Sequence, residues 1–238
     1  MLDPQARAQR EHFKASQAYE EAVRLLDLGY DDASAVFLDR AIQHLDRAID
    51  LMPFDASCRY DRGLAHQRRG HYRAAIADYS QALHLDGPDS DTFNNRGLAF
   101  ASVQEFDQAI HDFTAAMRVA PEDAKLYFNR GNAFGDYGRP YEAVADYGIA
   151  LGLAPGYAEA YFNRALALLA IGDYASALPD VTQSIDLNPS DADAYTLRSE
   201  IFAYLGVTQR AESDRATAFQ LARMSPPTGP DLLGHQGV

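Results

Sequence analysis

The sequence predicts an all-α fold in which antiparallel helix pairs stack into an array. Three observations support this prediction. First, an Asn-Arg dipeptide recurs with a constant spacing of 34 residues, at 95–96, 129–130 and 163–164, and an internal period in this range is typical of stacked repeats. Second, each period contains two runs of apolar and small residues at helical spacing. Third, glycine and proline residues, which end helices, separate these runs.

The stretch from Ala124 to Pro155 shows the repeating unit most clearly. Its first apolar run ends at Gly138, and glycine suits the left-handed conformation that closes a helix. Pro140 then suits the first turn of a second helix, where its missing N–H is not needed. The second run ends at Pro155. We therefore predict that one unit is a helix, a tight turn and an antiparallel helix.

Small and aromatic residues return at fixed places of the unit, counted with Ala124 as place one. Small residues at places eight and twenty would let two helix backbones approach closely, and an aromatic residue at place twenty-four would fill the adjacent space. The residues are Gly63, Gly97, Gly131 and Ala165 at place eight; Ala75, Ala109, Ala143, Ala177 and Ala211 at place twenty; and Tyr79, Phe113 and Tyr147 at place twenty-four. Most units close on a proline, namely Pro53, Pro121, Pro155 and Pro189.

This order of residue types at a period of 34 resembles the tetratricopeptide repeat (TPR) family. The resemblance covers roughly residues 15–225 and implies a right-handed superhelical solenoid of six repeats. The chain departs from the family pattern at place four, where the favoured Trp is absent. Arg59, Phe93, Tyr127, Tyr161 and Tyr195 stand there instead.

The domain organisation follows from this period. Residues 1–14 are expected to be an N-terminal extension of the first helix, which runs over residues 5–28 and ends at Gly29. Asp31 or Asp32 can cap the next helix, which continues to about Met52. The long first repeat spans 15–55, and five regular repeats follow at 56–89, 90–123, 124–157, 158–191 and 192–225. The Pro/Gly-rich tail at 226–238 is expected to be disordered. The long first repeat is either a cap on the stack or a docking element.

An arginine at place seven and an aspartate at place twenty-three occur together in five repeats. In an antiparallel hairpin these two places lie at about the same height, so each guanidinium can hold the carboxylate of its own or a stacked hairpin. We predict that these pairs stabilise the fold rather than bind an acidic ligand. They are Arg62 and Asp78, Arg96 and Asp112, Arg130 and Asp146, Arg164 and Asp180, and Arg198 and Asp214.

In the TPR family, as the resemblance implies, the first helices line a concave groove that receives a peptide or a partner segment. Places two, five, six, nine, twelve and thirteen point into it. The candidate peptide-binding residues at these places are Tyr19, Tyr60, Asn94, Asn95, Lys125, Phe128, Asn129, Asn132, Phe162 and Asn163.

Three of these asparagines, Asn95, Asn129 and Asn163, recur at place six. Because an amide offers both donors and an acceptor, such a ladder could hold the main chain of an extended peptide. It is similar to the asparagine ladder of the O-linked N-acetylglucosamine transferase repeats. The alternative is that these amides bond neighbouring helices within the stack.

Composition and motifs argue against several classes of function. The chain has 21 Lys and Arg against 34 Asp and Glu, a net charge of −13, which argues against a nucleic-acid-binding or anionic-membrane surface. It contains no apolar stretch long enough for membrane insertion, and its start lacks the apolar run of a secretory signal, so we expect a cytoplasmic location. No phosphate loop, nucleophile elbow or metal-binding motif is present. We therefore expect no enzymatic activity, no cofactor and no metal site.

Together these observations predict a non-enzymatic interaction module, a scaffold or adaptor that binds a protein or peptide partner in its groove. Two alternatives remain open. One is a self-assembling structural protein, which would form a homo-oligomer, and the other is an adaptor subunit of a separate enzyme.

Overall fold

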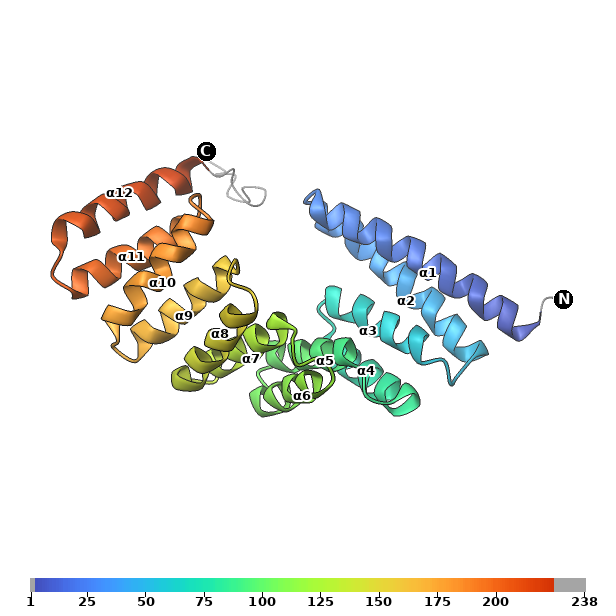
Figure 1. The fold of residues 1–238 in the computed structure, drawn as a ribbon. Helices are drawn as coiled ribbons and strands as arrows, with labels where there is room; N and C mark the ends of the chain where they lie inside the picture. The colour runs from blue at the N-terminus through green and yellow to red at the C-terminus, as the bar shows by residue number, and fades with distance from the viewer. Residues whose placement is uncertain (1–2, 225–238) are drawn as a thin grey trace, which may run out of the picture. The chain divides into compact units, whose positions relative to one another are not determined.

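The computed structural model describes residues 3–224, so the expected disorder of the tail at 226–238 lies outside the described part of the chain. Residues 3–224 form helices joined by short connections, without a strand (Figure 1). The all-α prediction is therefore confirmed. The helices are α1 (Pro4–Asp27), α2 (Asp31–Leu51), α3 (Ala56–Arg68), α4 (Tyr72–Asp86), α5 (Ser90–Ser102), α6 (Phe106–Val119), α7 (Ala124–Asp136), α8 (Pro140–Leu153), α9 (Ala158–Ala170), α10 (Tyr174–Leu187), α11 (Ala192–Tyr204) and α12 (Thr208–Met224).

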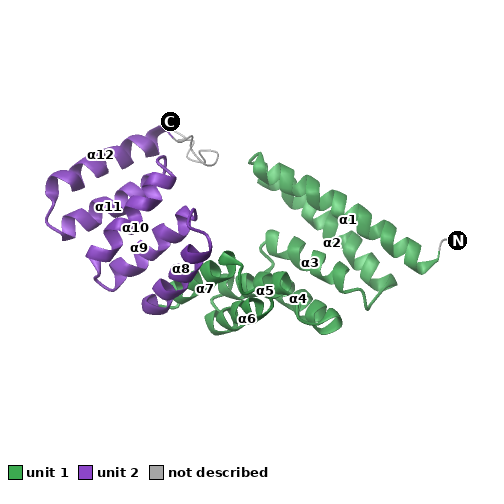
Figure 2. Ribbon diagram, viewed as in Figure 1, with its two compact units in different colours: residues 1–138 green, residues 139–238 purple. Residues whose placement is uncertain are grey.

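The described chain divides into two compact units, with the boundary between residues 138 and 139 (Figure 2). Unit 1 contains α1 to α7 and unit 2 contains α8 to α12. Within each unit, every helix packs against the helix that follows it. First helices of successive hairpins also touch, α3 with α5 and α5 with α7 in unit 1, and α9 with α11 in unit 2. Each unit is thus a stack of helix pairs.

Aspartates mark where most of the regular first helices begin. Asp89 precedes α5, and its carboxylate accepts a hydrogen bond from the backbone N–H of Thr92 at 2.7 Å. Asp55, Asp123 and Asp191 cap α3, α7 and α11 in the same way. Such a cap satisfies one of the backbone donors that a helix start leaves without a partner. Helices α3, α5, α7, α9 and α11 begin at residues 56, 90, 124, 158 and 192, the first residues of the repeats expected above.

The turn between α5 and α6 differs from the other hairpin turns. A glycine with φ between +75° and +79° stands at the equivalent place of the other regular hairpins, for example Gly70 and Gly172. Gln104 occupies this place between α5 and α6 and has φ +62°. A residue with a side chain adopts this left-handed conformation at a cost of about 1–2 kcal/mol, so this turn carries backbone strain.

Helices α1 and α2, with 24 and 21 residues, form the extended N-terminal hairpin that the sequence predicts. Gly29 follows α1 with φ +77°. The expected cap of α2 is wrong, because Tyr30 precedes the helix and makes no side-chain cap bond. Asp31 and Asp32 lie instead in the first turn of α2, where carboxylates interact favourably with the helix dipole.

Small residues and aromatic rings fill the space between the helices, as predicted. Gly97 on α5 lies against Phe113 on α6 so closely that an added Cβ would be 2.9 Å from Cε1 of the ring. At Gly63 the corresponding distance to Tyr79 would be 2.6 Å. The alanines at place twenty are at most 4% exposed in both units. The small residues are therefore contact surfaces between helices.

The arginines of place seven join helices of successive hairpins. Nε and Nη2 of Arg96 donate hydrogen bonds to the Asp112 carboxylate at 2.7 and 2.8 Å, and Nη1 donates to Oγ of Ser80 at 3.0 Å. Asp112 belongs to α6 of the same hairpin, whereas Ser80 belongs to α4 of the preceding one. One guanidinium on α5 thus links the second helices of two hairpins.

Arg62 repeats this arrangement in the preceding hairpin. Arg62 donates to Asp78 on α4 and to Asp46 on α2, so it also links two successive hairpins. The predicted Arg–Asp pairs are confirmed for Arg62 and Asp78, Arg96 and Asp112, Arg164 and Asp180, and Arg198 and Asp214. These aspartate side chains are at most 9% exposed. Because the buried carboxylates occupy the guanidinium groups, these arginines serve the fold.

Candidate partner-binding groove

The first helices of unit 1 contribute most of the lining of a groove. Its volume is about 620 Å³, within the range of about 300–1,000 Å³ that is usual for ligand sites. Most of its lining comes from α3, α5 and α7, with one residue each from α1, α4 and α6. The lining residues are Tyr19, Leu64, Gln67, Arg68, Tyr72, Asn95, Leu98, Ala101, Ser102, Phe113, Asn129, Asn132, Ala133 and Asp136.

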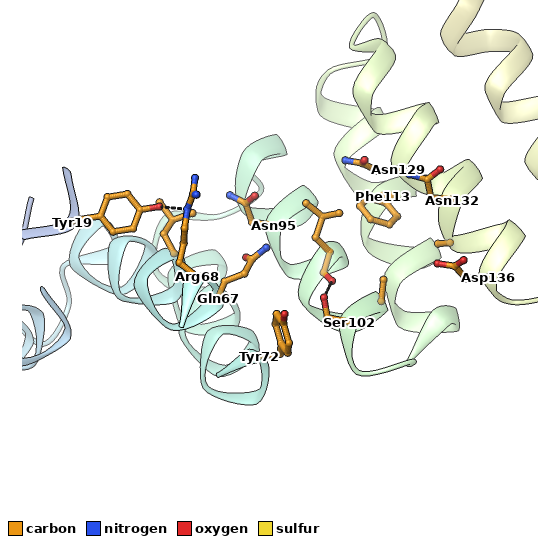
Figure 3. A pocket seen from close by; sticks show the side chains of 14 residues that line it. Tyr19, Gln67, Arg68, Tyr72, Asn95, Ser102, Phe113, Asn129, Asn132 and Asp136 are labelled. Carbon is orange, nitrogen blue, oxygen red and sulfur yellow. Dashed lines mark hydrogen bonds between the residues drawn. The ribbon is translucent and has the colours of Figure 1, made fainter. Parts of the chain in front are cut away.

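Figure 3 shows how the polar side chains are distributed along this groove. Tyr19 and Arg68 lie at one end, where Nε of Arg68 donates a hydrogen bond to the Tyr19 hydroxyl at 3.1 Å. Asn129 and Asn132 lie at the other end, and Asn95 lies between the two ends. The groove therefore offers polar groups along its length rather than at one point.

Two of the place-six asparagines bond to the preceding first helix. Nδ2 of Asn95 donates to the Tyr60 hydroxyl at 2.9 Å, and Nδ2 of Asn129 donates to Oδ1 of Asn94 at 2.8 Å. The alternative interpretation, that these amides bond neighbouring helices, is confirmed for Asn95 and Asn129. An amide has two donor hydrogens and an acceptor oxygen. Among the described residues, the Oδ1 atoms of Asn95 and Asn129 accept no hydrogen bond, so they can still accept one from a ligand.

The structure brings together some of the predicted site residues in unit 1. Tyr19, Asn95, Asn129 and Asn132 line the groove. Tyr60 and Asn94 do not line it, but they hold the amides that do. Lys125 is exposed in the first turn of α7 and Phe128 is half-buried on the same helix, and neither is among the lining residues.

The last two predicted site residues, Phe162 and Asn163, belong to α9 of unit 2. Phe162 is partly buried and packs against the core cluster that contains Leu168, Val181 and Ile201. Asn163 is half-buried. In unit 2 the aromatic ring of Phe162 therefore contributes to the core.

Sequence reasoning missed several polar lining residues, namely Gln67, Arg68, Ser102 and Asp136. They stand at places twelve and thirteen, which the TPR resemblance assigns to the groove. Their residue types differ from one repeat to the next, so no periodic signal marks them. Gln67 also accepts a hydrogen bond from the buried Tyr79 hydroxyl at 2.8 Å, and this bond connects the groove wall to the core.

The groove is close to electrically neutral. Arg68 and Asp136 are its only formally charged lining residues, and their charges are opposite. Burial raises the pKa of the Tyr60 hydroxyl to about 12, and the Asp91 and Asp89 carboxylates add to this effect. The hydroxyl that holds Asn95 is therefore uncharged at neutral pH. Such a surface suits uncharged polar groups, for example the N–H and C=O groups of a peptide main chain.

Residues 3–224 hold no group of three His, Cys, Asp or Glu side chains arranged to bind a metal ion. Burial raises the pKa of the Cys58 thiol to about 12, which keeps it protonated at neutral pH and so a poor nucleophile. Over the same residues, every helix is too short or too polar to cross a bilayer.

The model of the tetratricopeptide repeat family matches residues 60–102, 94–136, 130–192 and 165–226. No curated protein sequence matches the chain.

Several solved structures resemble the chain at low sequence identity. PilF of Pseudomonas aeruginosa has a TM-score of 0.70 and 16% identity, over 90% of this chain and 95% of that one. MamA of Desulfovibrio magneticus has a TM-score of 0.63 and 19% identity, over 75% of this chain and 97% of that one. YrrB is described as a TPR protein with an unusual peptide-binding site. It has a TM-score of 0.63 and 21% identity, over 76% of this chain and 93% of that one. At these identities the likeness is one of fold.

Proposed function

The chain belongs to the tetratricopeptide repeat family, and from this premise we propose that it is a non-enzymatic scaffold or adaptor that binds a protein segment in the groove of unit 1. The family fold is generally one of protein–protein interaction. YrrB is described as carrying a peptide-binding site on the same fold. The observation that carries the proposal is the groove of about 620 Å³, with amides and aromatic rings along its length.

Hydrogen bonds to the main chain of the partner would set its position. The Oδ1 atoms of Asn95 and Asn129 can accept from backbone N–H groups of an extended segment. A net gain of about 0.5–1.5 kcal/mol per hydrogen bond is too small to give tight binding from two amides alone. Tyr19 and Tyr72 lie in the same groove, and aromatic anchors of this kind supply most of the energy in many interfaces. We therefore expect the aromatic rings to supply most of the affinity and the amides to set the position of the segment along the groove.

Affinity capture followed by binding measurements tests this function. The tagged full chain is used to capture proteins from a lysate, the bound segment is mapped, and its affinity is measured as a synthetic peptide by calorimetry. We expect the Asn95→Ala/Asn129→Ala variant to capture fewer partners and to bind the peptide at least about tenfold more weakly, about 1.4 kcal/mol.

Because Asn95 and Asn129 also bond between helices, a second variant keeps the test decisive. Arg68→Gln/Asp136→Asn changes two exposed lining residues and leaves the amide bonds intact. Arg118→Gln, an exposed arginine outside the groove, is the control. Thermal unfolding verifies that each variant is folded. If both groove variants bind the peptide as tightly as the wild type, the segment does not occupy the groove.

A further inference from the structure

A second cavity lies on the N-terminal hairpin and has a different charge from the groove. Helices α1 and α2 run side by side (Figure 1), and the cavity between them has a volume of about 500 Å³. It is lined by Arg7, Arg10, Glu11, Lys14, Arg47, Asp50 and Leu51. We call it the basic cleft. All its lining residues belong to α1 and α2, so it shares none with the groove.

Basic side chains dominate this cleft, although acidic residues dominate the chain as a whole. The cleft is lined by more basic than acidic residues, namely Arg7, Arg10, Lys14 and Arg47 compared with Glu11 and Asp50. The chain as a whole has 21 basic and 34 acidic residues. Residues three and four apart on a helix are neighbours on its surface, so Arg7, Arg10 and Lys14 form one row along α1. The cleft is therefore a local positive site on a negative molecule.

The Glu11 carboxylate is already engaged within the hairpin. Lys14 Nζ donates to Glu11 Oε1 at 2.5 Å, and Nδ1 of His44 lies 2.7 Å from Oε2. Arg47 Nη1 lies 3.7 Å from the same Oε2. The bonds from Lys14 and then His44 lower the pKa of Glu11 to about 2, so it is ionised at neutral pH and its charge is matched by these neighbours.

Arg7 and Arg10 contrast with two other arginines of this hairpin, Arg24 and Arg47. Arg24 holds Glu21 and Arg47 approaches Glu11. Within residues 3–224, the side chains of Arg7 and Arg10 make neither a hydrogen bond nor an ion pair, and both residues are exposed. Two guanidinium groups of one cleft thus have no carboxylate of the described chain within 4.0 Å, although Asp50 lines the same cleft.

We propose that the basic cleft binds an acidic segment of a partner protein, with its carboxylates on Arg7 and Arg10. A guanidinium presents two parallel N–H groups that match a carboxylate. The aliphatic stems of the basic side chains and Leu51 offer apolar contact to the rest of the segment. A volume of about 500 Å³ accommodates a few side chains, so the segment contributes a short acidic stretch.

Charge distribution favours a protein segment over an extended polyanion. A nucleic acid or an anionic bilayer would extend past the cleft and meet the surface of a chain with net charge −13, which repels it. A short acidic segment concentrates its charge at the cleft. This inference uses a different surface from the proposed groove, so either can fail without the other.

Fluorescence anisotropy on the full chain tests the inference. The probe is a short labelled peptide of Glu, Ala and Leu, and its matched control has every Glu replaced by Gln. We expect the wild type to bind the Glu peptide, the Arg7→Gln/Arg10→Gln variant to bind it about tenfold more weakly, and added salt to weaken binding because the pairs are exposed.

Arg24→Gln is the control variant, because it removes a positive charge from α1 outside the cleft. It should retain wild-type affinity. Equal binding of the Glu and Gln peptides, or equal affinity of the wild type and the Arg7→Gln/Arg10→Gln variant, would overturn the inference. Tighter binding of phosphatidylserine vesicles or of a single-stranded oligonucleotide, with the same dependence on Arg7 and Arg10, would overturn the partner class.

Discussion

At the scale of single residues, one missing methyl group sets the distance between two helices. Gly97 has no Cβ, and the ring of Phe113 occupies the space where that atom would be. Phe113 has no solvent-exposed surface, and its ring also borders the groove. The preceding repeat of unit 1 shows the same close contact, with Gly63 against Tyr79. In close packing of this kind, a change of even one methyl group affects stability.

Replacing glycine by alanine should have opposite effects at Gly97 and Gly152. Both lie within helices, where alanine gains about 1 kcal/mol through helix propensity. At Gly97 the added Cβ lies 2.9 Å from Phe113, and overpacking costs about 1–3 kcal/mol. At exposed Gly152 a Cβ would meet no atom within 4 Å. We therefore expect Gly97→Ala to lower the midpoint of urea unfolding and Gly152→Ala to raise it.

Circular dichroism of the full chain measures both midpoints. The paired design separates propensity from packing, because the two variants differ only in the surroundings of the new methyl group. If Gly97→Ala raised the midpoint as much as Gly152→Ala, the close contact with Phe113 would not limit helix packing.

At the scale of helices, the arginines of place seven act between elements rather than within one. Arg96 on α5 bonds to Asp112 on α6 and to Ser80 on α4. Its guanidinium also lies 5.6 Å from the ring centroid of Phe93. Hydrophobic contacts hold the helices together without specifying their register. The directional hydrogen bonds of Arg96 fix the positions of three helices relative to one another along their axes.

Removal of this arginine should be far more costly than removal of an exposed one. Arg96→Ala leaves the Asp112 side chain, which is 2% exposed, without its cation, and breaking a buried pair costs about 3–5 kcal/mol. Arg24→Ala breaks a pair with Glu21 in which the side chains are 63% and 34% exposed, and because solvent screens such a pair it contributes little to stability. Urea unfolding of both variants measures the difference. Similar losses in the two variants would show that the Arg96–Asp112 pair does not support the stack.

The sequence predicted the features that depend on recurring residues, because contacts between helices need the same residue type in each repeat. Gly97 and Arg96 occupy repeated places, and the structure puts both where the period predicts. The sequence did not predict Tyr30 before α2, because a helix start without a side-chain cap has no residue signature. It also missed Gln67 and Arg68 in the groove, since side chains that face a partner vary between repeats. The sequence left open that Asn95 bonds a neighbouring helix, but it did not predict the partner, Tyr60, because the partner depends on the offset between stacked helices, which a period alone does not give.

At the scale of the whole molecule, the excess of acidic residues opposes folding. A net charge of −13 at neutral pH brings like charges together in the folded chain, and this self-repulsion destabilises compact states. Ion pairs act in the opposite direction. The Arg–Asp pairs lie inside the stack, where salt screens them little, whereas repulsion between exposed charges is screened within about 8–10 Å at physiological ionic strength.

Salt should therefore stabilise the protein at neutral pH. Screening weakens the repulsion among exposed carboxylates and also the exposed pairs such as Arg24 with Glu21, but exposed pairs of this kind contribute little to stability. Repulsion arises from the whole excess of negative charge, so we expect salt to stabilise the fold more by weakening this repulsion than it destabilises the fold by weakening exposed ion pairs. We expect the midpoint of urea unfolding at pH 7 to rise when sodium chloride is increased from low concentration to about 0.15 M.

The same measurement near pH 4.8, the isoelectric point of the sequence, separates this cause from a general salt effect on hydrophobic burial. There the net charge is close to zero, so little repulsion remains for salt to screen, while the ion pairs of the folded chain are still subject to screening. The stabilisation should vanish or change sign. An equal rise of the midpoint at both pH values would show that charge repulsion is not what salt relieves, because burial of apolar surface is the contribution that pH leaves unchanged.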